Sequence, residues 1–177
     1  MAEALTELDL RAYVRDVPDF PKPGILFRDL TPMLGDGAAF RQACALLAQP
    51  FSELGVAAVA GIESRGFTFG AVVAFMLGVG IVPVRKAGKL PAEVISARYQ
   101  LEYGEAVLEI HRDAIPPGTR VLVIDDLLAT GGTAAATLNL IRRVGGEPVG
   151  MGVVVELLQL GGRAKLQGER VVALLPL

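Results

Sequence analysis

The sequence predicts an α/β fold with a doubly wound, mainly parallel central sheet. Short apolar runs rich in β-branched residues alternate with helical patterns along its 177 residues, and this order is typical of parallel βαβ units. One such run, residues 121–124, leads through Asp125-Asp126 into a glycine-containing turn and then a helical pattern. Ligands of such sheets bind beyond the carboxyl ends of the strands, so we expect the site at that edge.

In the N-terminal part of the chain, the residue pattern predicts a helix, then an irregular passage and then a second helix. Residues 4–15 place leucines and a tyrosine on one helical face. The prolines between residues 18 and 23 then exclude a regular helix and predict an extended passage into residues 25–29. A second helical pattern covers residues 37–54 and ends at Gly55.

Strands and helices alternate through the rest of the chain. The apolar runs predict strands at 56–61, 81–84, 106–110, 121–125 and 148–156, and helices at 67–77 and 134–144. Residues 86–103 break this alternation, because they are mixed polar and contain Gly88 and Pro91. We predict a long exposed loop there, and loops of that length in a compact domain are usually functional.

The composition narrows the class of protein. The length fits a single domain, and the formal net charge of −2 argues against binding to nucleic acid or to an anionic membrane. The single Cys44 and single histidine fit a reducing cytosol and make a zinc site improbable. The N-terminus lacks the pattern of a signal peptide, and glycines and a proline interrupt the apolar run 67–84. We therefore expect a soluble, cytoplasmic protein.

The segment after residue 124 has the chemistry of a phosphate cradle. A helix N-terminus offers unpaired N–H groups and a positive dipole end to an anion, and Gly131 and Gly132 let the backbone curl around it. Hydroxyls of Thr130 and Thr133 can add donors or cap the helix. There is no lysine of an ATP loop and no dinucleotide fingerprint. The carboxylates of Asp125 and Asp126 suit a phosphate with sugar hydroxyls beside it, although ordinary α/β architecture is the alternative.

Two further predicted strand ends carry cations. Glu63-Ser64-Arg65 follows the strand at 56–61, and Arg85-Lys86 with Lys89 follows the strand at 81–84. We expect these side chains to converge on the edge that holds the phosphate loop, although each cation alone could be a solvated surface charge.

The 125–133 segment resembles the phosphoribosyl pyrophosphate (PRPP) motif of type I phosphoribosyltransferases. The resemblance implies that Asp125 and Asp126 face the ribose hydroxyls and that residues 129–133 (Ala129, Thr130, Gly131, Gly132, Thr133) hold the 5-phosphate. It also implies that the loop matching Glu63, Ser64 and Arg65 binds pyrophosphate, with a non-proline cis peptide near Glu63-Ser64. Arg85, Lys86 and Lys89 are expected to bind the same group, and Mg²⁺ is expected to arrive with PRPP rather than in a dedicated metal site.

The remaining motifs are similar to those of the adenine-specific branch of this family. They are residues 20–29, 63–70, 85–91, 101–104 and 108–110. The resemblance implies a single domain with a small N-terminal hood at about 1–35, a mobile loop at about 86–104 and the PRPP loop at 121–133. In the hood, Leu26 and Arg28 would read the purine edge, and Phe27 with Leu127 would sandwich the ring. From the residue type alone, core packing is the commoner role for Phe27.

The resemblance also implies a reaction, in which adenine and PRPP give AMP and pyrophosphate. Glu102 on the mobile loop, beside Tyr103, is the catalytic candidate, because a carboxylate there can accept the proton that adenine loses. A homodimer is expected from the family. Two rivals stay open: a phosphoribosyltransferase for hypoxanthine, guanine or xanthine, since few contacts set base choice, and a non-catalytic regulator that binds PRPP.

Overall fold

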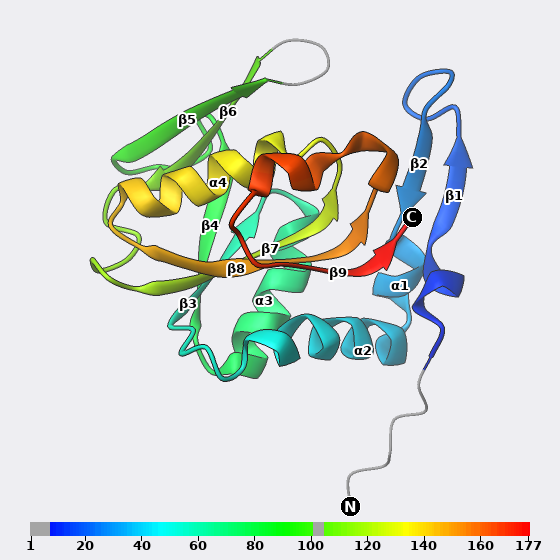
Figure 1. Ribbon diagram of the computed structural model, residues 1–177, viewed down its shortest axis with the longest axis horizontal. Helices are drawn as coiled ribbons and strands as arrows, with labels where there is room; N and C mark the ends of the chain where they lie inside the picture. The colour runs from blue at the N-terminus through cyan, green and yellow to red at the C-terminus, as the bar shows by residue number, and fades with distance from the viewer. Residues whose placement is uncertain (1–7, 101–104) are drawn as a thin grey trace, which may run out of the picture. The chain divides into compact units, whose positions relative to one another are not determined.

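The computed structural model describes residues 8–100 and 105–177, and its chain divides into two compact units. The first unit ends at Leu46, and the second spans Leu47–Leu177. Figure 1 shows the strands and helices of each unit along the chain. The first unit thus extends beyond the predicted hood of about 1–35, and the single domain remains a prediction.

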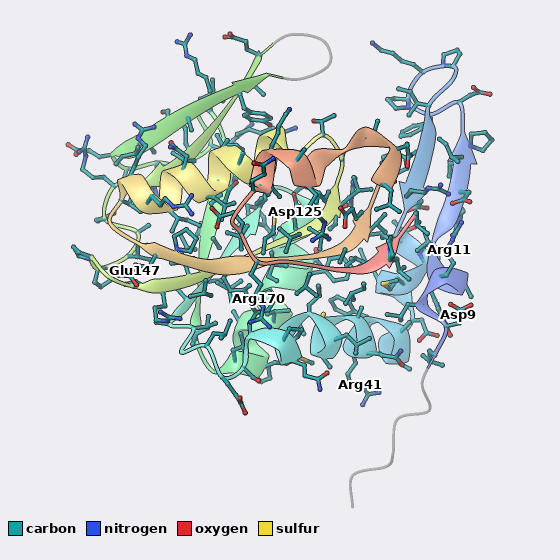
Figure 2. All side chains as sticks on the ribbon, in the orientation of Figure 1. Asp9, Arg11, Arg41, Asp125, Glu147 and Arg170 are labelled. Carbon is teal, nitrogen blue, oxygen red and sulfur yellow. The ribbon has the colours of Figure 1, made fainter. Side chains whose placement is uncertain are left out.

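The first unit begins with a short turn and a two-stranded ribbon. Its elements are the 3₁₀ helix η1 (Leu10–Tyr13), strands β1 (Arg15–Pro18) and β2 (Leu26–Asp29), and helix α1 (Thr31–Gly35). The predicted helix over 4–15 was therefore wrong in its described part. The Asp9 carboxylate accepts the N–H of Arg11 at 3.0 Å and caps the short turn. Figure 2 labels both residues. Residues from Arg15 onward instead pair with β2, where Val17 lies opposite Phe27.

Helix α2 (Gly37–Ala48) is shorter than the predicted helix over 37–54. A 3₁₀ turn, η2 (Gln49–Phe51), follows it directly. Pro50 explains the early end of the helix, since proline has no N–H to donate to the preceding turn.

A seven-stranded sheet organises the second unit, in the order β5-β6-β4-β3-β7-β8-β9. Five strands are parallel: β3 (Ala58–Ile62), β4 (Gly80–Lys86), β7 (Arg120–Leu128), β8 (Glu147–Glu156) and β9 (Val171–Pro176). Strands β5 (Val94–Gln100) and β6 (Glu105–His111) run antiparallel at one edge. The predicted doubly wound, mainly parallel sheet is confirmed.

Helices cover both faces of this sheet (Figure 1). Helix α3 (Arg65–Leu77) packs on β3, β4 and β7, and helix α4 (Gly132–Arg143) packs on the β5–β6 pair, β7 and β8. Val123, Ile124 and Val153 are fully buried, as expected of strands covered on both sides. Two short 3₁₀ turns, η3 (Leu158–Leu160) and η4 (Gly162–Leu166), connect β8 to β9. Within the described ranges, no helix is both long and apolar enough to cross a membrane.

Part of the predicted long loop is in fact a strand. Residues 94–100 form β5 and pair with β6 from Val94 opposite His111 onward. Ala97 of β5 is buried beside Leu108 of β6 in the main core. Strand β9 was not predicted either. Strands β5 and β9 are the two edge strands of the sheet. Each is stabilised by pairing with its neighbouring strand, so its own residue pattern does not indicate a strand.

Candidate active site

The candidate site lies where the strand order reverses. Strand β3 is the first strand of the sheet along the chain, with β4 on one side and β7 on the other. The connections after β3 and β7 therefore leave the same edge and diverge to helices on opposite faces of the sheet. Such a switch point is where open α/β sheets bind ligands, and it brings together the loops after residues 62, 86 and 128.

The two aspartates lie inside strand β7 and not in a turn after it. The strand continues to Leu128, so the prediction that it ends at residue 125 was wrong. Both carboxylates are buried, with Asp125 only 8% and Asp126 only 6% exposed. One oxygen of Asp125 accepts the N–H of Asp126 at 2.9 Å, and Figure 2 shows Asp125 in the interior of the unit. Burial, and then the negative charge of Asp126, raises the pKa of Asp125 well above its usual value.

Arg65 balances the charge of Asp126. Its Nε donates to Oδ2 of Asp126 in an ion pair between the start of α3 and the end of β7. The Arg65 side chain remains 41% exposed, while the Asp126 side chain is 9% exposed. Because one side of the pair faces outward, Arg65 can approach a ligand anion while it holds Asp126 in place.

A glycine allows α3 to start this close to β7. A Cβ at Gly66 would lie 2.8 Å from Oδ1 of Asp125 and 2.9 Å from the carbonyl oxygen of Ile124. Gly70, one turn later, would place its Cβ 3.3 Å from Cα of Gly61 on β3. Sequence reasoning did not single out Gly66 or Gly70 as packing residues, although their i, i+4 spacing on one helix face was available.

The predicted phosphate loop joins β7 to α4. Gly131 has a φ of 78° and stands at the cap position, and the helix begins at Gly132, two residues earlier than predicted. Ala129, Thr130 and Thr133 are half-buried, and both glycines are buried. Because a helix start leaves its first N–H groups without helical partners, the loop has the geometry of an anion cradle. Leu127, the predicted base contact, is half-buried two residues before it.

The second group of predicted residues forms a separate ion pair beyond β3 and β4. The peptide bond between Glu63 and Ser64 is cis, as the sequence resemblance implied. Nε and Nη2 of Arg85 donate to the two Glu63 oxygens at 3.1 and 3.3 Å. Arg85 Nη1 also donates to the carbonyl oxygen of Lys89 at 2.8 Å. Glu63 thus fixes Arg85 between the two loops, while the side chains of Lys86 and Lys89 are exposed.

The pKa of Glu63 reflects these contacts. Desolvation acts to raise it, but the hydrogen bonds from Arg85 and from the backbone N–H of Lys86 outweigh desolvation and hold the pKa below its ordinary value. Glu63 therefore carries a negative charge at neutral pH and orients the guanidinium of Arg85. Direct contact between Glu63 and pyrophosphate stays a prediction.

Comparisons with known proteins agree with this geometry. A family model described as the phosphoribosyl transferase domain matches residues 33–171. An adenine phosphoribosyltransferase of Methylococcus capsulatus is 57% identical over 166 residues, which is 94% of this chain and 97% of the relative. One from Carboxydothermus hydrogenoformans is 53% identical over 167 residues, with coverage of 94% and 98%. The chain belongs to the adenine phosphoribosyltransferase family.

Solved adenine phosphoribosyltransferases share the fold. The crystal structure from Rhodothermus marinus has a TM-score of 0.91 at 50% identity and covers 95% of this chain and 96% of its own. The enzyme from Saccharomyces cerevisiae, solved with adenine and an imino-altritol bisphosphate, has a TM-score of 0.88 at 41% identity, with coverage of 93% and 96%. The family resemblance inferred from the sequence is confirmed.

Three of the four predicted adenine contacts of this family member, Leu26, Phe27 and Arg28, lie on β2 in the first unit. Arg28 forms an ion pair with Asp16, which Arg11 also contacts at 2.7 Å. These hydrogen bonds, from Arg28 and then Arg11, lower the pKa of Asp16. The buried Nε of Arg28 has no hydrogen-bond partner in the described part of the chain. Phe27 packs edge-on against Phe20 at 5.1 Å between ring centroids, and Leu26 is 47% exposed.

Two predicted residues fall outside the described residues. Glu102, the predicted catalytic acid–base group, and its neighbour Tyr103 belong to the segment between β5 and β6 that the structure does not describe. Their roles stay predictions.

Proposed function

We propose that this adenine phosphoribosyltransferase family member transfers the 5-phosphoribosyl group of PRPP to adenine and releases AMP and pyrophosphate. The observation that carries the proposal is the edge formed by β3 and β7, where an anion cradle directly follows two buried carboxylates. Kinship over nearly the whole chain with adenine phosphoribosyltransferases selects adenine as the acceptor base. This is a purine-salvage step.

PRPP would bind along the edge of the sheet. The N–H groups of residues 129–133 would hold the 5-phosphate, and Asp125 and Asp126 would face the ribose hydroxyls. At the other end, Arg65, Arg85, Lys86 and Lys89 supply the positive charge for pyrophosphate. Glu63 and Ser64 shape the backbone of that loop, and Glu63 holds Arg85 in position.

In the reaction, a ring nitrogen of adenine forms a bond to the anomeric carbon as the carbon–oxygen bond to pyrophosphate breaks. Glu102 would accept the proton that adenine loses, with Tyr103 beside it on the loop. Closure of that loop would exclude the water that otherwise hydrolyses PRPP. Leu26 and Arg28 would read the base edge, with Phe27 and Leu127 against its faces.

Mg²⁺ fits this site as a companion of PRPP. Asp126 is paired with Arg65, and Asp125 has a raised pKa, so the two carboxylates do not make a dedicated site for an ion. Among the described residues, no group of three or more histidine, cysteine, aspartate or glutamate side chains could hold a metal. Mg²⁺ binds readily through substrate phosphates and water, and there it would neutralise charge on the leaving pyrophosphate.

One assay tests the proposal. Purified protein is incubated with PRPP, Mg²⁺ and each purine base in turn, and nucleotide formation is measured. We expect AMP from adenine. Turnover of hypoxanthine, guanine or xanthine without AMP formation would contradict the base assignment, and PRPP binding without turnover of any base would favour the regulator. Homodimer formation and a cytoplasmic location stay predictions, and sedimentation of the purified protein tests the first.

A further inference from the structure

The short segment between β8 and β9 lies directly behind the phosphate loop. A Cβ at Gly162 would collide with the carbonyl oxygen of Ala129 and lie 2.8 Å from the backbone nitrogen of Gly131. A Cβ at Gly131 would in turn collide with the carbonyl oxygen of Gly162. The two backbones therefore touch without an intervening side chain. Any displacement of Gly162 changes the space that the loop can occupy, because a close-packed contact cannot absorb it.

A bidentate ion pair holds this segment in place. Arg163, the residue after Gly162, donates from Nε to Oε1 of Glu156 at 2.9 Å and from Nη2 to Oε2 at 2.5 Å. Its Nη1 also donates to the carbonyl oxygen of Val171 on β9 at 3.0 Å. Glu156 is the last residue of β8 and is only 4% exposed. All six atoms of this arrangement belong to the second unit.

The buried charge of Glu156 requires a cationic partner, which is Arg163. A buried carboxylate is costly unless a partner neutralises it, and the hydrogen bond to Glu156 also raises the pKa of Arg163. The register places Glu156 opposite Leu128 of β7, and the N–H of Leu157 donates to the carbonyl oxygen of Leu128 at 2.9 Å. The carboxylate is thus anchored beside the last residue before the loop. Through Arg163 it fixes the backbone of the neighbouring Gly162, which touches that loop.

From these contacts we infer that Glu156 and Arg163 are positioning residues that set the conformation of the 129–133 loop for the 5-phosphate of the substrate. The inference rests on the proposed function, because it assigns that loop to the phosphate on the ribose. It predicts a selective defect. Loss of the pair weakens binding of the ribose phosphate end and leaves the pyrophosphate end, held by the β3 and β4 loops, unchanged.

The test measures binding of two fragments to the whole protein by calorimetry in the presence of Mg²⁺. Ribose 5-phosphate probes the loop, and pyrophosphate probes the opposite end. For Arg163→Ala we expect the Kd of ribose 5-phosphate to rise about tenfold or more, since small misplacements of binding groups cost that much. The Kd of pyrophosphate is expected to stay within about twofold. Arg163→Lys keeps the charge but loses the paired N–H donors of the guanidinium. Its Kd for ribose 5-phosphate is expected to lie between those of Arg163→Ala and the parent protein.

Two controls make the result decisive. Arg142→Ala removes the ion pair that joins Glu169, at the far end of the same segment, to the C-terminal end of α4 at 2.5 Å. Because neither residue adjoins Gly162, both Kd values are expected to stay unchanged. Glu156→Gln keeps the shape of Glu156 and covers the case in which Arg163→Ala fails to fold. Equal losses for both fragments, or a lower melting temperature with unchanged binding in the folded variants, would overturn the inference. Failure of the proposed function would appear separately, as a parent protein that forms no AMP or does not bind ribose 5-phosphate.

Discussion

Replacement of Gly66 by alanine tests whether the close approach of α3 to β7 shapes the active site. The added Cβ would lie 2.8 Å from Oδ1 of Asp125 and 2.9 Å from the Ile124 carbonyl oxygen, whereas ordinary contact begins near 3.4 Å. The start of the helix must therefore move by about 0.5 Å, because the Ile124 oxygen belongs to a central strand and cannot yield. Overpacking of this kind costs about 1–3 kcal/mol, and the better helix propensity of alanine returns up to about 1 kcal/mol.

The net expectation is a loss of about 0.5–2 kcal/mol, which lowers Tm by about 1–8 °C in a chain of this length. Activity should suffer more than stability. The displaced helix start carries Arg65, which pairs with Asp126, and small misplacements of substrate-binding groups cost about 10–100-fold in kcat/KM. Thermal unfolding and AMP formation from adenine and PRPP measure the two effects.

The matched control is Gly80→Ala in the same unit, where the added methyl group meets no heavy atom within 4 Å. It should change neither Tm nor kcat/KM appreciably. If Gly66→Ala behaves like Gly80→Ala in both measurements, the close approach of helix and strand does not shape the site, and the reasoning is refuted.

Three further predictions concern charged groups of the site. Glu102→Ala should lower kcat by about 10²–10⁴ with little change in Tm, the range for an acid–base group, and a loss below about threefold would remove Glu102 from the proton transfer. Arg65→Ala should raise the KM for PRPP and the Kd of pyrophosphate by about tenfold, since a charge-assisted hydrogen bond is worth about 1.5–3 kcal/mol; an unchanged pyrophosphate Kd would count against that role. Asp125→Asn should stabilise the protein increasingly as pH rises above about 4. The folded Asp125 has a raised pKa, so the parent loses stability as pH rises from the ordinary aspartate range through that raised pKa, and the variant does not. Unfolding curves from pH 4 to pH 8 measure this, and a difference between the two proteins that does not vary with pH would contradict the assignment.

The central strands and the phosphate loop could be predicted because their signals are local. The run at 121–124 is apolar enough to need burial on both faces, and glycines after a strand announce a turn before a helix. Strand β1 and strand β5 could not be read in this way. Each is stabilised by hydrogen bonds to one partner strand, β2 or β6, and a pattern within the strand reports burial rather than the presence of that partner.

By itself the sequence determined the fold class, the family and the residue types at the ends of the strands. Periodicity carries the fold class, because it depends on neighbours a few residues apart, whereas the family rests on the resemblance of motifs such as residues 63–70 and 125–133. Only the tertiary structure decided how those residues pair: Arg65 with Asp126, 61 positions away, Arg85 with Glu63, 22 positions away, and Gly162 with Gly131. These contacts join separate loops that the strand order brings to one edge, so no local pattern could announce them. They divide the predicted cations into the exposed Lys86 and Lys89 and the two arginines, Arg65 and Arg85, that pair with carboxylates.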